Sequence, residues 1–245
     1  MIDLHKDAAR QGPGGDDETR LAVRLSGLKG ANNLKVADIG CGTGASTLVL
    51  ANELDAQITA VDFLPELLSK LDGAAARRGV ADRITTVVQS MDALRFAEGE
   101  YDAIWAEGAI YNIGFAAGVE AWRRYLKPGG ILAVSELTWL TDTRPEELQV
   151  HWDGEYPETA TASAKMAILE RIGFAPIGYF VLDEHCWLDN YYWPMQERFA
   201  GFLERNGHSD AAKNIVAAEE HEISLYERYK ALFSYGYYIA RKTAS

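Results

Sequence analysis

The stretch from Lys35 to Gly44 constrains the fold of this chain more than any other, and it reads K-V-A-D-I-G-C-G-T-G. A short apolar run ends at Ile39, glycines follow at alternate positions, and the next residues have the spacing of an amphipathic helix. Glycine permits positive φ angles and close approach of a ligand, while a helix N-terminus offers free N–H groups. The stretch therefore predicts a buried strand, a tight turn and a helix around a nucleotide-like ligand.

Two acidic residues indicate which kind of nucleotide-like ligand the turn binds. Asp38 lies two residues before the first glycine, and a second predicted strand, Q-I-T-A-V, ends at Asp62, about twenty residues further on. The glycine spacing alone also fits a dinucleotide-binding loop. However, the Asp38 carboxylate would repel a pyrophosphate and suits a cationic ligand, whereas Asp62 can accept hydrogen bonds from both ribose hydroxyls. Phe63 is placed to cover one face of an adenine ring.

D-I-G-C-G-T-G followed by V-D-F resembles motifs I and II of class I S-adenosylmethionine (SAM)-dependent methyltransferases. The resemblance implies an α/β Rossmann-like sheet of seven strands in the order 3-2-1-4-5-7-6, with strand 7 antiparallel and helices on both faces. It implies SAM as cofactor and S-adenosylhomocysteine as product. The residues expected to bind the cofactor are Arg10, Asp38, Gly40, Cys41, Gly42, Gly44, Asp62, Phe63, Ser90, Met91, Asp92 and Glu107.

The chain of 245 residues is expected to form one methyltransferase domain. Within it we predict an N-terminal segment that closes over the cofactor (1–34), a SAM-binding core (35–182), an insertion (183–234) and a last strand (235–241). R-Q-G-P-G-G, from Arg10 to Gly15, is similar to an N-terminal motif of bacterial small-molecule methyltransferases, although a flexible leader would also explain it. The aromatic start of the insertion, Cys186 to Trp193, is interpreted as a substrate lid, and its helices as packing or an interface.

The methyl acceptor is expected to contact the loop E-G-A-I-Y-N-I-G and the C-terminal end of the strand that follows it, I-L-A-V-S-E-L. The predicted catalytic residues are His185, Tyr111 and Glu136, with His185 the first candidate for a general base. The predicted substrate-binding residues are Tyr111, Asn112, Trp139 and Trp187. Tyr111 has a simpler alternative as a packed aromatic residue, and His185 has one as a structural histidine. The favoured reaction is in-line methyl transfer to nitrogen or oxygen of a small molecule, with carbon methylation of a quinone-like ring as the alternative.

Composition limits the partners. A net charge of −12 argues against nucleic acid, because phosphate binding requires a basic face, and the loop lacks the proline motif of DNA amino-methyltransferases. No apolar run reaches membrane-spanning length, and two cysteines indicate a reducing, cytoplasmic compartment. A metal site is not expected, since His185 and Cys186 lack further ligands at usable spacing. A homodimer, a non-catalytic SAM-binding protein and a nicotinamide-dependent oxidoreductase stay open.

Overall fold

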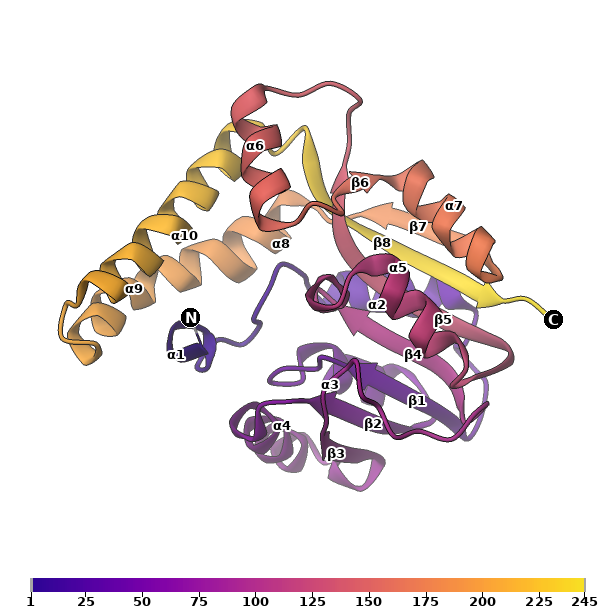
Figure 1. Cartoon of the computed structure of the whole chain (residues 1–245). Coiled ribbons are helices and arrows are strands. Elements are labelled where there is room, and N and C mark those ends of the chain that lie inside the picture. Colours follow the sequence, from indigo (N-terminus) through magenta and orange to yellow (C-terminus); the bar gives the residue numbers. More distant parts are fainter. Residues whose placement is uncertain (1, 245) are drawn as a thin grey trace.

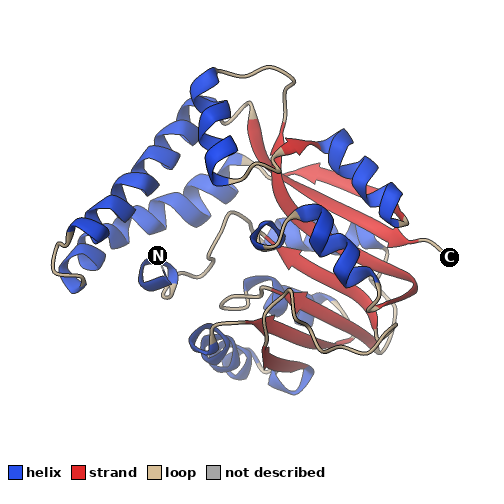
Figure 2. Cartoon of the chain, in the orientation of Figure 1, coloured by secondary structure: helices blue, strands red, loops and turns tan. Residues whose placement is uncertain are grey.

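The computed structural model describes residues 2–244 as a single twisted sheet with helices on both faces (Figure 2). The strands are β1 (Leu34–Ile39), β2 (Ala56–Asp62), β3 (Ile84–Val88), β4 (Tyr101–Glu107), β5 (Leu126–Trp139), β6 (Ala160–Thr161), β7 (Phe174–Val181) and β8 (Phe233–Lys242). The α-helices are α1 (Ile2–His5), α2 (Asp16–Ser26), α3 (Ala45–Glu53), α4 (Pro65–Arg78), α5 (Phe115–Arg123), α6 (Glu146–Glu155), α7 (Ala162–Ile172), α8 (Glu184–Trp187), α9 (Trp193–Arg205) and α10 (Asp210–Tyr229). Short helical turns are η1 (Ala81–Arg83), η2 (Ile110–Asn112) and η3 (Leu188–Tyr192).

The strand order confirms the predicted topology. The sheet runs β3-β2-β1-β4-β5-β8-β7, in which β7 and β8 are the predicted sixth and seventh strands. As predicted, the last strand, β8, is antiparallel to its neighbours β5 and β7. One strand was not predicted: the two residues of β6 pair with the end of β5. Parallel strands leave their carboxyl ends along one edge, and open α/β sheets bind ligands there.

Along the central strands, apolar side chains point alternately to the two faces of the sheet, and each face is covered by a layer of helices. Val36 and Trp105 face the cluster that contains residues of α2, α3 and α4, whereas Ala37 and Ile104 face the cluster of α5 and α7. Successive strand residues point to opposite faces, so strands covered on both sides read as continuous apolar runs. Both faces of the sheet are therefore buried beneath helices (Figure 1).

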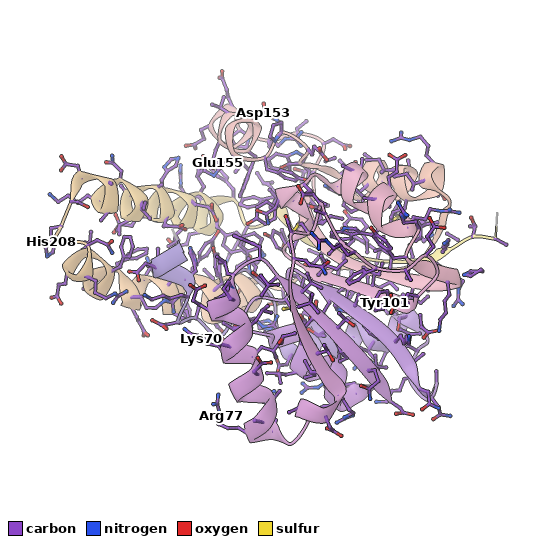
Figure 3. All side chains as sticks on the ribbon, turned by 60° about the horizontal axis from the view of Figure 1, so that its bottom comes forward. Lys70, Arg77, Tyr101, Asp153, Glu155 and His208 are labelled. Carbon is purple, nitrogen blue, oxygen red and sulfur yellow. The ribbon has the colours of Figure 1, made fainter. Side chains whose placement is uncertain are left out.

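The insertion departs from the sheet as a helical hairpin. In Figure 1, α9 and α10 run side by side away from the strands, and α1 lies against α9. Figure 3 shows His208 at the tip of this hairpin. Near its base the hairpin packs into the same apolar cluster as β8 through Tyr226 and Phe233, whose rings meet edge-on at 5.6 Å. No helix among the described residues is long and apolar enough to cross a lipid bilayer.

Candidate functional site

The glycine turn after β1 brings bare backbone to the ligand edge of the sheet. The amides of Gly40 and Cys41 donate to the Val61 carbonyl at 2.8 and 3.0 Å, which joins the turn to β2. Gly40 has a φ of +72°, and a Cβ at this position would lie 2.5 Å from the Ala109 Cβ. Any larger residue would be strained and would collide with the loop after β4. Gly44 supports the turn from behind: it begins α3, and a Cβ there would lie 2.2 Å from Leu71.

Asp38 lies behind the turn and does not line the cavity beside it, which corrects the prediction that its carboxylate faces the cofactor. Its Oδ2 atom accepts hydrogen bonds from Ser46 Oγ at 2.8 Å and Thr47 Oγ1 at 2.6 Å. Burial raises the pKa of Asp38 to about 7 despite these two bonds. The residue therefore fixes the start of α3 and shapes the loop, and any influence on a ligand is indirect.

A cavity of about 720 Å³ opens along the carboxyl ends of the strands. Most of the predicted site residues line it: Arg10, Gly40, Cys41, Gly42, Asp62, Phe63, Ser90, Met91, Asp92, Glu107, Tyr111, Asn112, Glu136 and Trp187. Sequence reasoning missed further polar and aromatic lining residues, among them His5, Gln11, Gln89, Glu155, Tyr191, Glu219, Glu222 and Tyr235. The cavity extends from the side of β3 to the side of β5 and the insertion.

One end of this cavity suits a nucleoside. Asp62 is 8% exposed; its Oδ2 accepts from the Gly42 amide at 3.0 Å and its Oδ1 from the Leu64 amide at 2.9 Å. These bonds orient the carboxylate and leave each oxygen a lone pair for a hydroxyl donor. Phe63, 60% exposed, offers a ring face beside it. The turn at Ser90–Asp92 is held by the Trp122 indole, which donates to the Met91 carbonyl at 2.9 Å.

The N-terminal segment packs against the glycine turn and lines the cavity through Arg10 and Gln11. Gln11 Oε1 accepts from the Thr43 amide at 3.0 Å, and Gln11 Nε2 donates to Thr43 Oγ1 at 3.2 Å. The segment also meets the insertion, since Asn190 donates to the Gly14 carbonyl at 2.8 Å. Residues before β1 and residues after β7 thus close over the glycine turn together.

Glu107 connects the N-terminal segment to the sheet through hydrogen bonds and an ion pair. Its Oε1 atom accepts from Thr19 Oγ1 at 2.7 Å, Tyr237 Oη at 3.0 Å and Trp105 Nε1 at 3.1 Å. Its Oε2 atom lies 3.1 Å from Arg10 Nη1. Because these groups occupy most of its acceptor capacity, Glu107 acts chiefly as an anchor. Arg10 keeps unused guanidinium donors and lines the cavity, where they can meet a carboxylate.

Glu136 stands at the opposite end of the cavity. Its side chain is buried, with Oε1 accepting from the Leu137 amide at 2.8 Å and lying 4.0 Å from Lys165 Nζ. Within residues 2–244, Oε2 of Glu136 has no hydrogen-bond partner. Burial raises the pKa of Glu136 to about 7, although the Lys165 charge opposes this. A carboxyl group that titrates near neutrality can take up a proton during a reaction. Tyr111 lies at the same end, with its ring 6.1 Å from that of Tyr156.

Besides Asp38, two residues with predicted catalytic or substrate-binding roles lie outside the cavity lining. His185 does not line the cavity; its side chain is 43% exposed, and its ring nitrogens lie 3.2 Å from Asp183 Oδ1 and 3.5 Å from Glu18 Oε1. Glu18, His185 and Cys186 have donor atoms within 4.8 Å of one another, a neighbourhood that spacing along the chain could not show. Trp139 is also outside the cavity, packed edge-on against Phe233.

The segment predicted to be a substrate lid, Cys186 to Trp193, packs closely against the core through several of its side chains. Trp187 is 2% exposed, stacks on Tyr226 at 4.7 Å and donates from its indole to Ser234 Oγ at 2.9 Å. Tyr192 is fully buried and donates to Glu222 at 2.8 Å. Trp187 thus lines the cavity as a closely packed side chain, and Tyr192 supports the same segment from the core.

Comparison with known proteins agrees with this geometry. A family described as "Methyltransferase domain" matches residues 36–130. Residues 36–130 are therefore similar to a methyltransferase domain. A crystal structure of a SAM-dependent methyltransferase from Geobacter sulfurreducens with S-adenosylhomocysteine superposes with a TM-score of 0.84 at 19% identity, covering 98% of this chain and 96% of that one.

Curated relatives with similar sequences include both C-methyltransferases and O-methyltransferases. The sterol 24-C-methyltransferase erg-4 of Neurospora crassa is 28% identical over 189 residues, covering 73% of this chain and 48% of that protein. The ubiquinone/menaquinone biosynthesis C-methyltransferase UbiE of a Geobacter species is 31% identical over 129 residues, covering 51% and 53%. The chain spans about half the length of these curated relatives, so likeness to them does not assign an acceptor.

Proposed function

We propose that the protein transfers the methyl group of SAM to a nitrogen or oxygen atom of a small molecule. The observation that carries this proposal is the single cavity that joins the nucleoside-like end at Asp62 to the buried carboxyl group of Glu136. A donor bound at the glycine turn and an acceptor bound near Glu136 would share one enclosure. Methyl transfer from a sulfonium is an in-line displacement, so alignment and the exclusion of water supply most of the catalysis.

The cofactor fits the residues of the first end. We propose that the Asp62 carboxylate binds the ribose hydroxyls, that Phe63 covers the adenine, and that Asp92 and the Met91 backbone read its edge. Arg10 is placed to bind the carboxylate of the amino-acid part. The turn at Gly40 and Gly42 would support the ligand with backbone alone, because a side chain at Gly40 would collide with Ala109. SAM supplies an activated methyl group when bound there.

At the second end we propose that Glu136 receives the proton that the acceptor loses. The acceptor atom forms a bond to the methyl carbon while the sulfur–carbon bond breaks and its electron pair stays on sulfur. Tyr111 and Asn112 would orient the acceptor. Carbon methylation of a quinone-like ring is the second candidate, supported by the C-methyltransferases among the relatives. The predicted homodimer, and the division of the chain at residues 34, 182 and 234, stay predictions.

Titration calorimetry tests whether the protein binds SAM as the methyl donor, and transfer of a labelled methyl group tests whether it catalyses methylation. We expect the purified protein to bind SAM and S-adenosylhomocysteine, and not NADH. Incubation with methyl-labelled SAM and panels of amines, phenols and quinols should then transfer label to one class. Binding of NADH alone would favour an oxidoreductase, whereas tight SAM binding with no transfer to any panel would favour a SAM-binding protein without catalysis.

A further inference from the structure

The part of the cavity around Glu136 is strongly acidic. Four carboxyl groups line it, from three elements distant in the sequence: Glu136 on β5, Glu155 at the end of α6, and Glu219 and Glu222 on α10. Figure 3 shows Glu155 on the last turn of α6, nearer to the body of the molecule than Asp153. We refer to these four residues as the acidic wall. Glu155 is exposed, whereas Glu136 and Glu219 are buried and Glu222 is partly buried. Burying carboxyl groups together is costly unless a cation or a proton compensates their charge.

Glu136 and Glu219 each have a basic neighbour, whereas Glu155 and Glu222 form no ion pair within residues 2–244. Lys165 Nζ is 4.0 Å from Glu136, but Lys165 is fully buried and lies outside the cavity lining. His5 Nε2 is 3.6 Å from Glu219 Oε1. Glu222 accepts from the Tyr192 hydroxyl at 2.8 Å, and burial, with the Glu219 charge adding to it, raises the pKa of Glu222 to about 7.

The other basic groups of the cavity have partners of their own. Lys6 forms an ion pair with Asp3, and Arg10 lies between Glu107 and Asp16. Among residues 2–244, the groups that face the acidic wall from neighbouring elements are tyrosines more than bases. Burial raises the pKa of Tyr111, and the charges of Glu222, Glu136 and Glu219 act in the same direction. The charges of these three acids therefore all reach the Tyr111 hydroxyl.

Aromatic rings complete this end of the cavity. Tyr111, Trp152, Tyr156, Tyr191 and Tyr235 all line it. Trp152 Nε1 and Tyr156 Oη are buried and have no hydrogen-bond partner among the described residues. Ring faces beside carboxylates attract an alkylammonium group, which gains cation–π contact and charge-assisted hydrogen bonds together. A phenolate or a carboxylate acceptor would instead be repelled by those of the four carboxyl groups that are ionised.

We propose that the methyl acceptor is an organic amine, which binds as an ammonium cation between the acidic wall and the rings of Tyr111 and Tyr191. This inference rests on the proposed methyl transfer and names its substrate class. The ammonium group gives its proton to Glu136 or Glu222, which frees the nitrogen lone pair. The nitrogen then bonds to the methyl carbon, the sulfur–carbon bond breaks toward sulfur, and the product nitrogen carries the positive charge that the sulfonium loses.

Binding to the complex with S-adenosylhomocysteine tests the charge preference without turnover. The ligands are choline and its neutral carbon isostere 3,3-dimethylbutan-1-ol, which have nearly the same shape. We expect choline to bind about tenfold or more tightly than the alcohol, since one charged interaction contributes that much. Equal affinities, or no measurable binding of choline, would overturn the amine assignment. Failure of S-adenosylhomocysteine itself to bind would instead refute the proposed function.

Substitutions on α10 test whether the bound cation lies beside Glu219 and Glu222. Glu222→Gln and Glu219→Gln should each weaken choline binding about tenfold while leaving the affinity for S-adenosylhomocysteine unchanged. Glu220→Gln is the matched control, because Glu220 is exposed on the same helix and does not line the cavity. In the transfer assay, 2-(dimethylamino)ethanol and N,N-dimethylbenzylamine should accept label, whereas benzyl alcohol should not. Preferential labelling of benzyl alcohol, or unchanged choline affinity in both variants, would contradict the proposal.

Discussion

Replacement of Asp62 by alanine tests the donor end most directly. In the structure this carboxylate is oriented by the amides of Gly42 and Leu64 at 3.0 and 2.9 Å, so its free lone pairs point in fixed directions. Two ribose hydroxyls bonded to a charged acceptor should together contribute about 1–3 kcal/mol of net affinity. Asp62→Ala should therefore weaken SAM binding by roughly 5-fold to 150-fold.

Titration calorimetry with S-adenosylhomocysteine measures this loss, and circular dichroism checks that the variant is folded. Asp82→Asn is a suitable control, because Asp82 is an exposed residue of η1 and lies outside the cavity. An Asp62→Ala protein that is folded and binds S-adenosylhomocysteine with wild-type affinity would refute the assignment of the ribose site.

Three further predictions concern stability. Gly40→Ala should lower the free energy of unfolding in urea by more than Gly79→Ala does: both glycines have positive φ, which costs roughly 1 kcal/mol, but only Gly40 would also collide with a neighbour. Glu107→Gln should destabilise the fold by about 1–3 kcal/mol and speed hydrogen exchange around Arg10, whereas Glu98→Gln, in an exposed pair with Arg124, should change little. Glu222 has a folded-state pKa raised to about 7, so the unfolded chain releases this proton first and the stabilising protonated form is lost as pH rises from about 4.5 through 7. Glu222→Gln should accordingly gain stability relative to wild type across that window, and parallel pH profiles would contradict this.

The prediction of His185 as a base shows where sequence reasoning fails. His185 is adjacent to Cys186 and Trp187, which are both buried, and near other aromatic residues, which suggested a pocket. On a helix, however, successive side chains are rotated by about 100°, so neighbours in sequence face different surroundings. Trp187 and Cys186 point into the core, and His185 points outward to Asp183 and Glu18.

The acidic wall could not be predicted from the sequence for a related reason. Glu219 and Glu222 belong to a long helix rich in charged residues, a pattern typical of a solvated face. Their burial depends on how α10 lies against the cavity, where Tyr192 at the end of η3 donates a hydrogen bond to Glu222. No local pattern specifies such a contact between distant elements.

The sequence by itself determined the strand, glycine turn and helix at residues 34–53 and the acid at position 62, because backbone conformation and strand ends depend on local residues. Tertiary structure alone decided that Asp38 lies behind the turn, that Glu107 anchors Arg10, and that carboxyl groups from β5, α6 and α10 meet in one cavity. The physical reason is that the direction and surroundings of a side chain depend on packing between elements distant in the chain.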